Sequence, residues 1–99
     1  MKINKIIKPK RFSRFVIVPT AIFRHENISA GATGLYCWLF SHNENQEMTF
    51  TFILNHFKEG RNALQSKMKE LESIGFLVRE QIKIEYKFKG YNYILNDVP

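Results

Sequence analysis

The sequence lacks the features of several protein classes. It has one cysteine among 99 residues, so no disulfide framework exists and a reducing compartment is the simplest setting. No run of 18 apolar residues is present, which excludes a membrane-spanning helix. The apolar stretch 15–23 imitates a signal peptide, but Pro19 interrupts it and charged residues follow it directly. We therefore expect a cytoplasmic protein without a membrane partner.

Motifs that carry chemistry are also missing. His25, His42 and His56 lie far apart in the sequence, whereas a structural zinc ion needs four close nitrogen or sulfur ligands. The phosphate-binding loop Gly-x-x-x-x-Gly-Lys-Ser/Thr is absent. Cys37 flanks the apolar face of an expected helix, where its expected role is packing. The sequence predicts a protein that is not an enzyme and has no metal, cofactor or small-molecule substrate.

What remains is a globular composition with an uneven distribution of charge. Hydrophobic residues make up 44% and charged residues 24% of the chain, which is ordinary for one folded domain of this length. The net charge is +6, and residues 1–14 hold six basic residues and no acidic one, so the rest is formally neutral. We divide the chain into a basic arm (1–13), a domain (14–96) and a tail (97–99).

The basic arm has two interpretations. In the first, it is a solvated terminus that aids solubility. In the second, it follows phosphates or lies in a groove of a nucleic acid. The second interpretation predicts contacts with the DNA backbone from Lys8, Lys10, Arg11 and Arg14.

Apolar spacing and turn signals predict the elements of the first half. The β-branched segment 14–18 predicts a short strand or an extended entry segment, and Pro19 fits the first turn of a short helix that ends at Arg24. Ser29 is a typical N-cap. It begins an amphipathic helix over 29–41, in which apolar residues recur at helical spacing.

The next segment predicts two helices joined by a short turn. Residues 49–50 favour a short strand, and Thr51 is expected to cap a helix over 52–57. The helix over 61–74 is the best defined, because Gly60 is an acceptable N-cap and Gly75 stands where a left-handed glycine ends a helix. Its predicted buried stripe consists of Leu64, Met68 and Leu71.

After Gly75 the apolar period changes from helical to two. Residues 76–86 and 91–95 alternate, and residues 87–90 are expected to turn the chain, which predicts a β-hairpin with a basic tip. Helices followed by a helix–turn–helix and a hairpin are the layout of a winged helix-turn-helix. The predicted fold class is α+β, with three to four helices and a C-terminal β-hairpin wing.

The chain resembles a known group of proteins. The segment 60–79 is similar to the recognition helix and first wing strand of winged-helix proteins, and 87–93 is similar to the wing. Together with 15–19 and 29–36, these segments resemble small helix-turn-helix proteins of phages, plasmids and integrated elements, including the N-terminal domains of phage replisome organisers and plasmid replication initiators. The resemblance covers about 14–96 and implies binding of double-stranded DNA in replication initiation or transcriptional regulation. Such replication proteins usually continue into a further domain, so we expect either a stand-alone binder or the N-terminal part of a longer protein.

The resemblance and the helical spacing select candidate DNA contacts. A recognition helix enters the major groove with the face opposite its buried stripe, mainly through its N-terminal part. At about 100° per residue, the side chains expected on that surface are Arg61, Asn62, Gln65, Ser66 and Lys69. On the wing, expected contacts with the DNA backbone are Arg79, Lys83, Lys87 and Lys89. Glu70 and Glu72 flank the helix surface and would repel phosphates.

A second hypothesis keeps the fold and changes the partner. Winged helices also serve as protein-interaction modules. The chain is then an adaptor that binds a replisome component, a host factor or its own copy as a homodimer, without specific DNA binding. Aromatic side chains suited to such an interface are Trp38, Phe88 and Tyr91.

Overall fold

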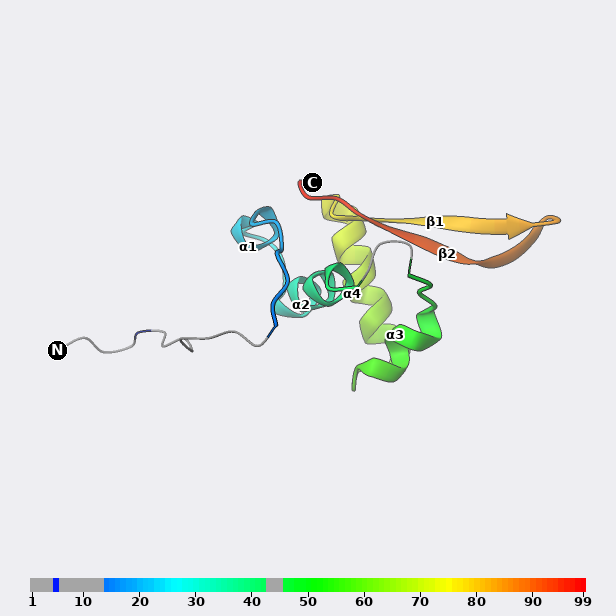
Figure 1. Ribbon diagram of the computed structural model, residues 1–99, viewed down its shortest axis with the longest axis horizontal. Coiled ribbons are helices and arrows are strands. Elements are labelled where there is room, and N and C mark those ends of the chain that lie inside the picture. The colour runs from blue at the N-terminus through cyan, green and yellow to red at the C-terminus, as the bar shows by residue number, and fades with distance from the viewer. Residues whose placement is uncertain (1–4, 6–13, 43–45) are drawn as a thin grey trace.

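The computed structural model describes residues 5, 14–42 and 46–99. Within these residues, four helices precede a C-terminal antiparallel hairpin, so the predicted α+β winged helix-turn-helix class is confirmed. The hairpin projects from the helical body, and α1 lies at the opposite end (Figure 1). The elements are α1 (Ala21–Arg24), α2 (Ala30–Phe40), α3 (Phe50–His56), α4 (Arg61–Ile74), β1 (Leu77–Ile84) and β2 (Lys87–Leu95).

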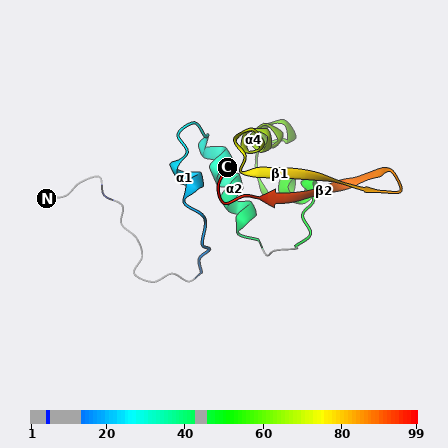
Figure 2. The ribbon, with the colours of Figure 1, turned by 90° about the horizontal axis from the view of Figure 1, so that it is seen from above.

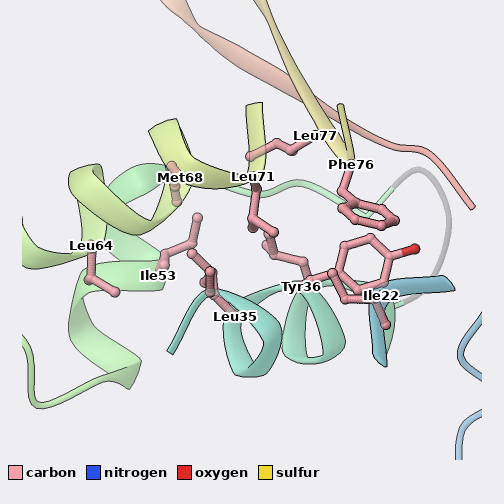
Figure 3. Close-up of a cluster of buried hydrophobic side chains, with 11 residues drawn as sticks. Ile22, Leu35, Tyr36, Ile53, Leu64, Met68, Leu71, Phe76 and Leu77 are labelled. Atoms are coloured by element: carbon pink, nitrogen blue, oxygen red, sulfur yellow. The ribbon is translucent and has the colours of Figure 1, made fainter. Parts of the chain in front are cut away.

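The hydrophobic core lies between α2 and α4 (Figure 3). The predicted stripe of α4 is confirmed, since its three side chains are at most 1% exposed. Side chains one and two turns apart on a helix share one face, so a single stripe can pack along α2. Burying a side chain of this size stabilises the fold by about 1.5–3 kcal/mol. The other buried core residues are Ile22, Ala32, Leu35, Tyr36, Leu39, Ile53, Phe76 and Leu77.

Side-chain caps fix where the helices begin. The Ser29 hydroxyl accepts a hydrogen bond from the Ala32 amide at 3.1 Å, as expected for the N-cap of α2. In α3 the cap is Thr49, whose hydroxyl accepts from the Phe52 amide at 3.0 Å. The predicted cap at Thr51 and the predicted strand over 49–50 are therefore wrong. Because the cap closes two residues earlier, the segment expected as a strand becomes the first turn of the helix.

Of the two forms predicted for the N-terminal segment of the domain, the strand is not observed. Residues 14–18 form no strand in the described structure, and the only described sheet consists of β1 and β2. A β-branched sequence favours extended backbone, but a strand also needs a neighbour for its backbone hydrogen bonds. The expected helix up to Arg24 is present in shortened form as α1, which starts two residues after Pro19.

The two strands of the wing pair over their full length. Gly75 has φ of 110° and ends α4 in the left-handed region, as predicted. The turn of the hairpin lies at Glu85 and Tyr86, not at the expected 87–90, so Lys87 and Lys89 belong to β2. Gly90, which suggested the turn, has φ of 134° and lies at a register shift opposite Ile82. Its conformational freedom therefore serves a bulge within the strand.

Asn96 holds the base of the hairpin on the helices. Its backbone carbonyl accepts a hydrogen bond from the Tyr36 hydroxyl of α2 at 2.9 Å. Its backbone amide donates to the Phe76 carbonyl, and its side-chain amide donates to the Gly75 carbonyl, each at 2.9 Å. These contacts fix the base of the wing against the end of α4, while the distal part extends beyond the body (Figure 2).

Candidate nucleic-acid interface

Helix α4 presents a polar face on the side opposite its buried stripe. Asn62, Ser66 and Lys69 are exposed, as the helical spacing predicted. Arg61 is exposed as well, and its guanidinium carbon lies 5.0 Å from the centre of the Phe50 ring, so a cation–π contact orients it. Gln65 is half-buried at the edge of this face. The exposed face of α4 thus offers an amide, a hydroxyl and cationic groups to a partner.

One acidic side chain of α4 is bound to the start of α2. Glu70 accepts hydrogen bonds from the Ser29 amide at 2.6 Å and from the Ser29 hydroxyl at 2.8 Å. These two bonds, with a smaller contribution from the charge of Lys67, lower the pKa of the Glu70 carboxyl below its ordinary value. A carboxylate at a helix N-terminus also interacts favourably with the helix dipole. Glu70 therefore has a partner within the domain.

The other acidic side chain of α4 binds the wing. Glu72 accepts from Arg79 Nη2 at 2.6 Å and from Arg79 Nε at 2.9 Å. Arg79 Nη1 donates to Gln65 Oε1 at 2.8 Å, and its guanidinium carbon lies 5.3 Å from the centre of the Tyr91 ring. The Arg79 side chain is only 10% exposed. Arg79, for which a contact with the DNA backbone stays a prediction, joins the wing to α4 and holds Gln65.

The remaining cationic side chains of the wing lie near its tip. Lys83 is in β1, and Lys87 and Lys89 are in β2. All three are exposed. Lys83 pairs with Phe88 across the hairpin, and Ile84 pairs with Lys87. Because residues alternate between faces along a strand, these pairs place lysines on both faces of the distal wing.

A groove of about 1200 Å³ separates the wing from the helices. Arg61 and Gln65 line it from α4, and Lys89, Phe88 and Tyr91 line it from the wing. It therefore brings together expected contact residues from two elements. The two aromatic side chains belong to a row on one face of β2 in which neighbouring rings lie 5.1 Å and 6.3 Å apart: Phe88, Tyr91 and Tyr93. The period-two spacing of the tyrosines was the sequence signal for this row, but the bulge that brings Phe88 into it was not predicted.

The arm provides one described candidate. Arg14 is exposed at the start of the described domain. The other expected contacts of the arm, Lys8, Lys10 and Arg11, lie outside the described residues.

A second surface feature is an aromatic cluster on α2 and α3, centred on Trp38. The His56 ring stacks on Trp38 with centroids 4.6 Å apart, and the His42 ring meets it edge-on at 4.4 Å. Phe52 and Phe57 complete the cluster at 6.0 Å and 5.0 Å. Trp38 is half-buried, whereas Phe52 is 46% exposed. The cluster thus joins the two helices and leaves part of its aromatic surface in solvent.

Three other observations concern the chemistry of the domain. Burial raises the pKa of the Cys37 thiol, which favours the neutral form that packs beside the core. In the part of the chain that the structure describes, no group of three or more His, Cys, Asp or Glu side chains is arranged to hold a metal ion. No helix among residues 5, 14–42 and 46–99 has the length and apolarity needed to cross a membrane.

Three comparisons with known proteins found no match. Neither a family model, nor a curated protein, nor a solved structure matches this chain.

Proposed function

We propose that this chain is a cytoplasmic, double-stranded DNA-binding protein of a mobile genetic element that acts in replication initiation or transcriptional regulation. Helix α4 inserts into the major groove, and the wing contacts the backbone. This mechanism requires no catalytic residue, metal or cofactor.

The observation that carries the proposal is the charge arrangement of α4. Its exposed face holds Asn62, Ser66 and Lys69, while Glu70 and Glu72 are each bound to a partner within the domain. Both carboxylates are thus held by other elements, and the charge of Glu72 is compensated by Arg79, whereas Glu70 stays ionised and is held by Ser29. Asn side chains suit adenine, and Lys side chains suit guanine or phosphate. The face resembles a DNA-reading surface more than a merely solvated one.

The lysines of the wing support the same geometry. Lys83, Lys87 and Lys89 are exposed on the distal hairpin, and Lys89 also lines the groove between the wing and α4. A DNA backbone that runs beside a major-groove helix passes close to such a wing, where cationic side chains fix register and orientation.

The test is a binding series with a DNA site selected from a random library. We expect Asn62→Ala to lower the affinity about 5- to 150-fold and to relax the preference at one base pair, because a bidentate contact contributes about 1–3 kcal/mol of discrimination. We expect Lys69→Ala to weaken binding with a smaller effect on base preference. Arg24→Ala is the charge-matched control, since Arg24 is exposed on α1, at the end of the molecule opposite the wing. Unchanged affinity and base preference in both α4 variants would refute the assignment of α4.

The second candidate function is the protein adaptor, which the Trp38 cluster favours. Aromatic side chains are enriched at the centres of protein interfaces, and Trp is the most common hot-spot residue. In this case the partner is a replisome component, a host factor or a second copy of the chain. Sizing chromatography with Phe52→Ala, together with a gel shift on random duplex DNA at low salt, separates the two functions. A stable oligomer that Phe52→Ala dissociates, with no gel shift, would favour the adaptor.

A further inference from the structure

The tip of the wing carries an aromatic side chain that has no structural role. Tyr86 is fully exposed, with a relative accessibility of 101%, in the turn between β1 and β2. The turn end of the hairpin points away from the helices (Figure 2). The next aromatic rings along the wing, Phe88 and Tyr91, lie against each other at 5.1 Å instead of against Tyr86. A ring in this position contributes nothing to the core of the domain.

The backbone at the tip is unfavourable for this residue. Glu85 has φ of 53° and Tyr86 has φ of 63°, both in the left-handed region. Two-residue hairpin turns with both residues in this region strongly favour Asn-Gly or Asp-Gly, because other side chains are strained there. Strained residues that packing does not explain are concentrated at functional sites. The tip therefore keeps a tyrosine at a position where local stability favours glycine.

The surroundings of Tyr86 combine apolar and cationic groups. Ile84 and Phe88 flank the tip and are 56% and 55% exposed. Lys83 and Lys87 lie in the two strands within three residues of Tyr86, and both are exposed. An exposed aromatic ring with cationic side chains in the adjoining strands is a combination that binds unpaired nucleotides, in which the base stacks on the ring and cationic groups hold the phosphates.

We propose that the wing tip is a second nucleic-acid site that takes an unpaired base, with Tyr86 as the stacking side chain and Lys83 and Lys87 as phosphate contacts. This inference rests on the proposed function, because α4 must first place the wing on DNA. A continuous duplex offers only base edges in its grooves, since each base face is covered by its neighbours. The protein therefore prefers a duplex that contains unpaired or unstacked bases beside the site of α4, because only those bases offer a face to the ring.

Nucleic acid is favoured over a lipid surface by the charge at the apex. Glu85 is the immediate neighbour of Tyr86 in the turn and is exposed. Insertion of the tip into a bilayer would carry this carboxylate towards the hydrocarbon, which is unfavourable. Stacking of Tyr86 on a base leaves Glu85 in water.

The experiment compares two DNA ligands, a continuous duplex and the same duplex with a short bubble that contains 2-aminopurine. The 99-residue wild-type chain, Tyr86→Ala, Tyr86→Trp and the control Phe23→Ala are titrated by fluorescence anisotropy. Tyr86→Ala keeps a Cβ and hence the same turn strain, so it isolates the ring. Phe23→Ala removes another exposed aromatic, on α1, away from the wing. Thermal melts confirm that each variant is folded.

We expect the wild-type chain to prefer the bubble and Tyr86→Ala to lose about tenfold in affinity for it, with little change on the continuous duplex. Tyr86→Trp should keep the preference and quench 2-aminopurine, and Phe23→Ala should behave as wild type.

Equal binding of the bubble by wild type and Tyr86→Ala would overturn the inference. If Asn62→Ala still weakens binding to the continuous duplex, the proposed function survives that result. If wild type binds neither DNA, both fail. Binding to phosphatidylserine vesicles that Tyr86→Ala abolishes would assign the tip to membranes instead.

Discussion

At the residue scale, hydrogen bonds within the domain decide which side chains of α4 face a partner. Glu70 is held by Ser29, and Glu72 is held by Arg79. Neither carboxylate is fully buried, so each pair stabilises the fold modestly. Their larger consequence is directional, because the acidic groups point at α2 and the wing while Lys69 stays exposed.

The contact between Glu70 and Ser29 predicts a pH dependence. Because the bonds from Ser29 lower the pKa of Glu70 in the folded state, the stabilisation is present above the ordinary carboxyl pKa. It is lost as the pH falls through the lowered folded value. We expect Glu70→Gln to be less stable than wild type in urea unfolding at neutral pH, with the difference shrinking in acid. Glu26→Gln, at an exposed site on the loop after α1, is the matched control. A difference that is constant across this pH range would contradict the prediction.

At the element scale, the glycines of α2 have different roles. Helix α2 contains Gly31 and Gly34, and a glycine, which has no Cβ, can allow a neighbouring element to approach closely. A Cβ at position 31 would collide with the aliphatic end of Lys67 from α4, whereas one at position 34 would meet nothing within 4 Å. The Lys67 side chain thus packs over Gly31 and would have to move if position 31 carried a Cβ, whereas position 34 has free space. Both glycines line a small hollow beside α4.

This difference predicts a stabilising substitution. We expect Gly34→Ala to raise the free energy of unfolding by about 0.5–1 kcal/mol, since alanine in a helix interior loses less backbone entropy than glycine. Chemical denaturation of the purified chain measures the change. Gly75→Ala is the opposite control, because the φ of 110° at Gly75 disfavours any side chain and the variant should be less stable. Destabilisation by Gly34→Ala would show that its open space is needed.

At the scale of the whole molecule, the net positive charge is concentrated at the N-terminal end of the chain. Residues 1–14 carry a charge equal to the net +6, and the remaining chain is formally neutral. The high isoelectric point is therefore weak evidence that the domain itself binds DNA. The proposed DNA binding rests instead on the local arrangement of Lys69, Lys83, Lys87 and Lys89 on α4 and the wing.

The separation of charge predicts how binding responds to salt. If the arm and the wing both contact the backbone, about five phosphates are neutralised and the slope of log K against log salt is about −4 to −5. Deletion of residues 1–13 should reduce the magnitude of this slope and weaken binding on all sequences, with the base preference mostly unchanged. Anisotropy titrations at several salt concentrations measure both effects. A slope near zero for the intact chain would contradict the electrostatic part of the proposal.

Much of the fold was predictable from short-range patterns. Helices α2 and α4 follow from apolar spacing and from caps at Ser29 and Gly75, which depend on residues a few positions apart. The errors occurred where two local signals competed. Thr49 and Thr51 are both suitable caps, and Gly90 suits both a turn and a bulge. The packing of α3 selected Thr49 as the cap, and the pairing of the two strands selected the bulge at Gly90.

The sequence by itself determined the fold class, the buried stripe of α4 and the exposure of Asn62, Ser66 and Lys69, because helical periodicity fixes which residues share a face. Only the tertiary structure decided the roles of Arg79 and Tyr86. The guanidinium of Arg79 meets α4 because β1 begins beside the end of that helix and Arg79 faces it, and the register of the strands places Tyr86 in the turn. The contacts of Arg79 join two different elements, and the position of Tyr86 depends on the register of the strands. Local spacing in the sequence specifies neither the contacts nor the register.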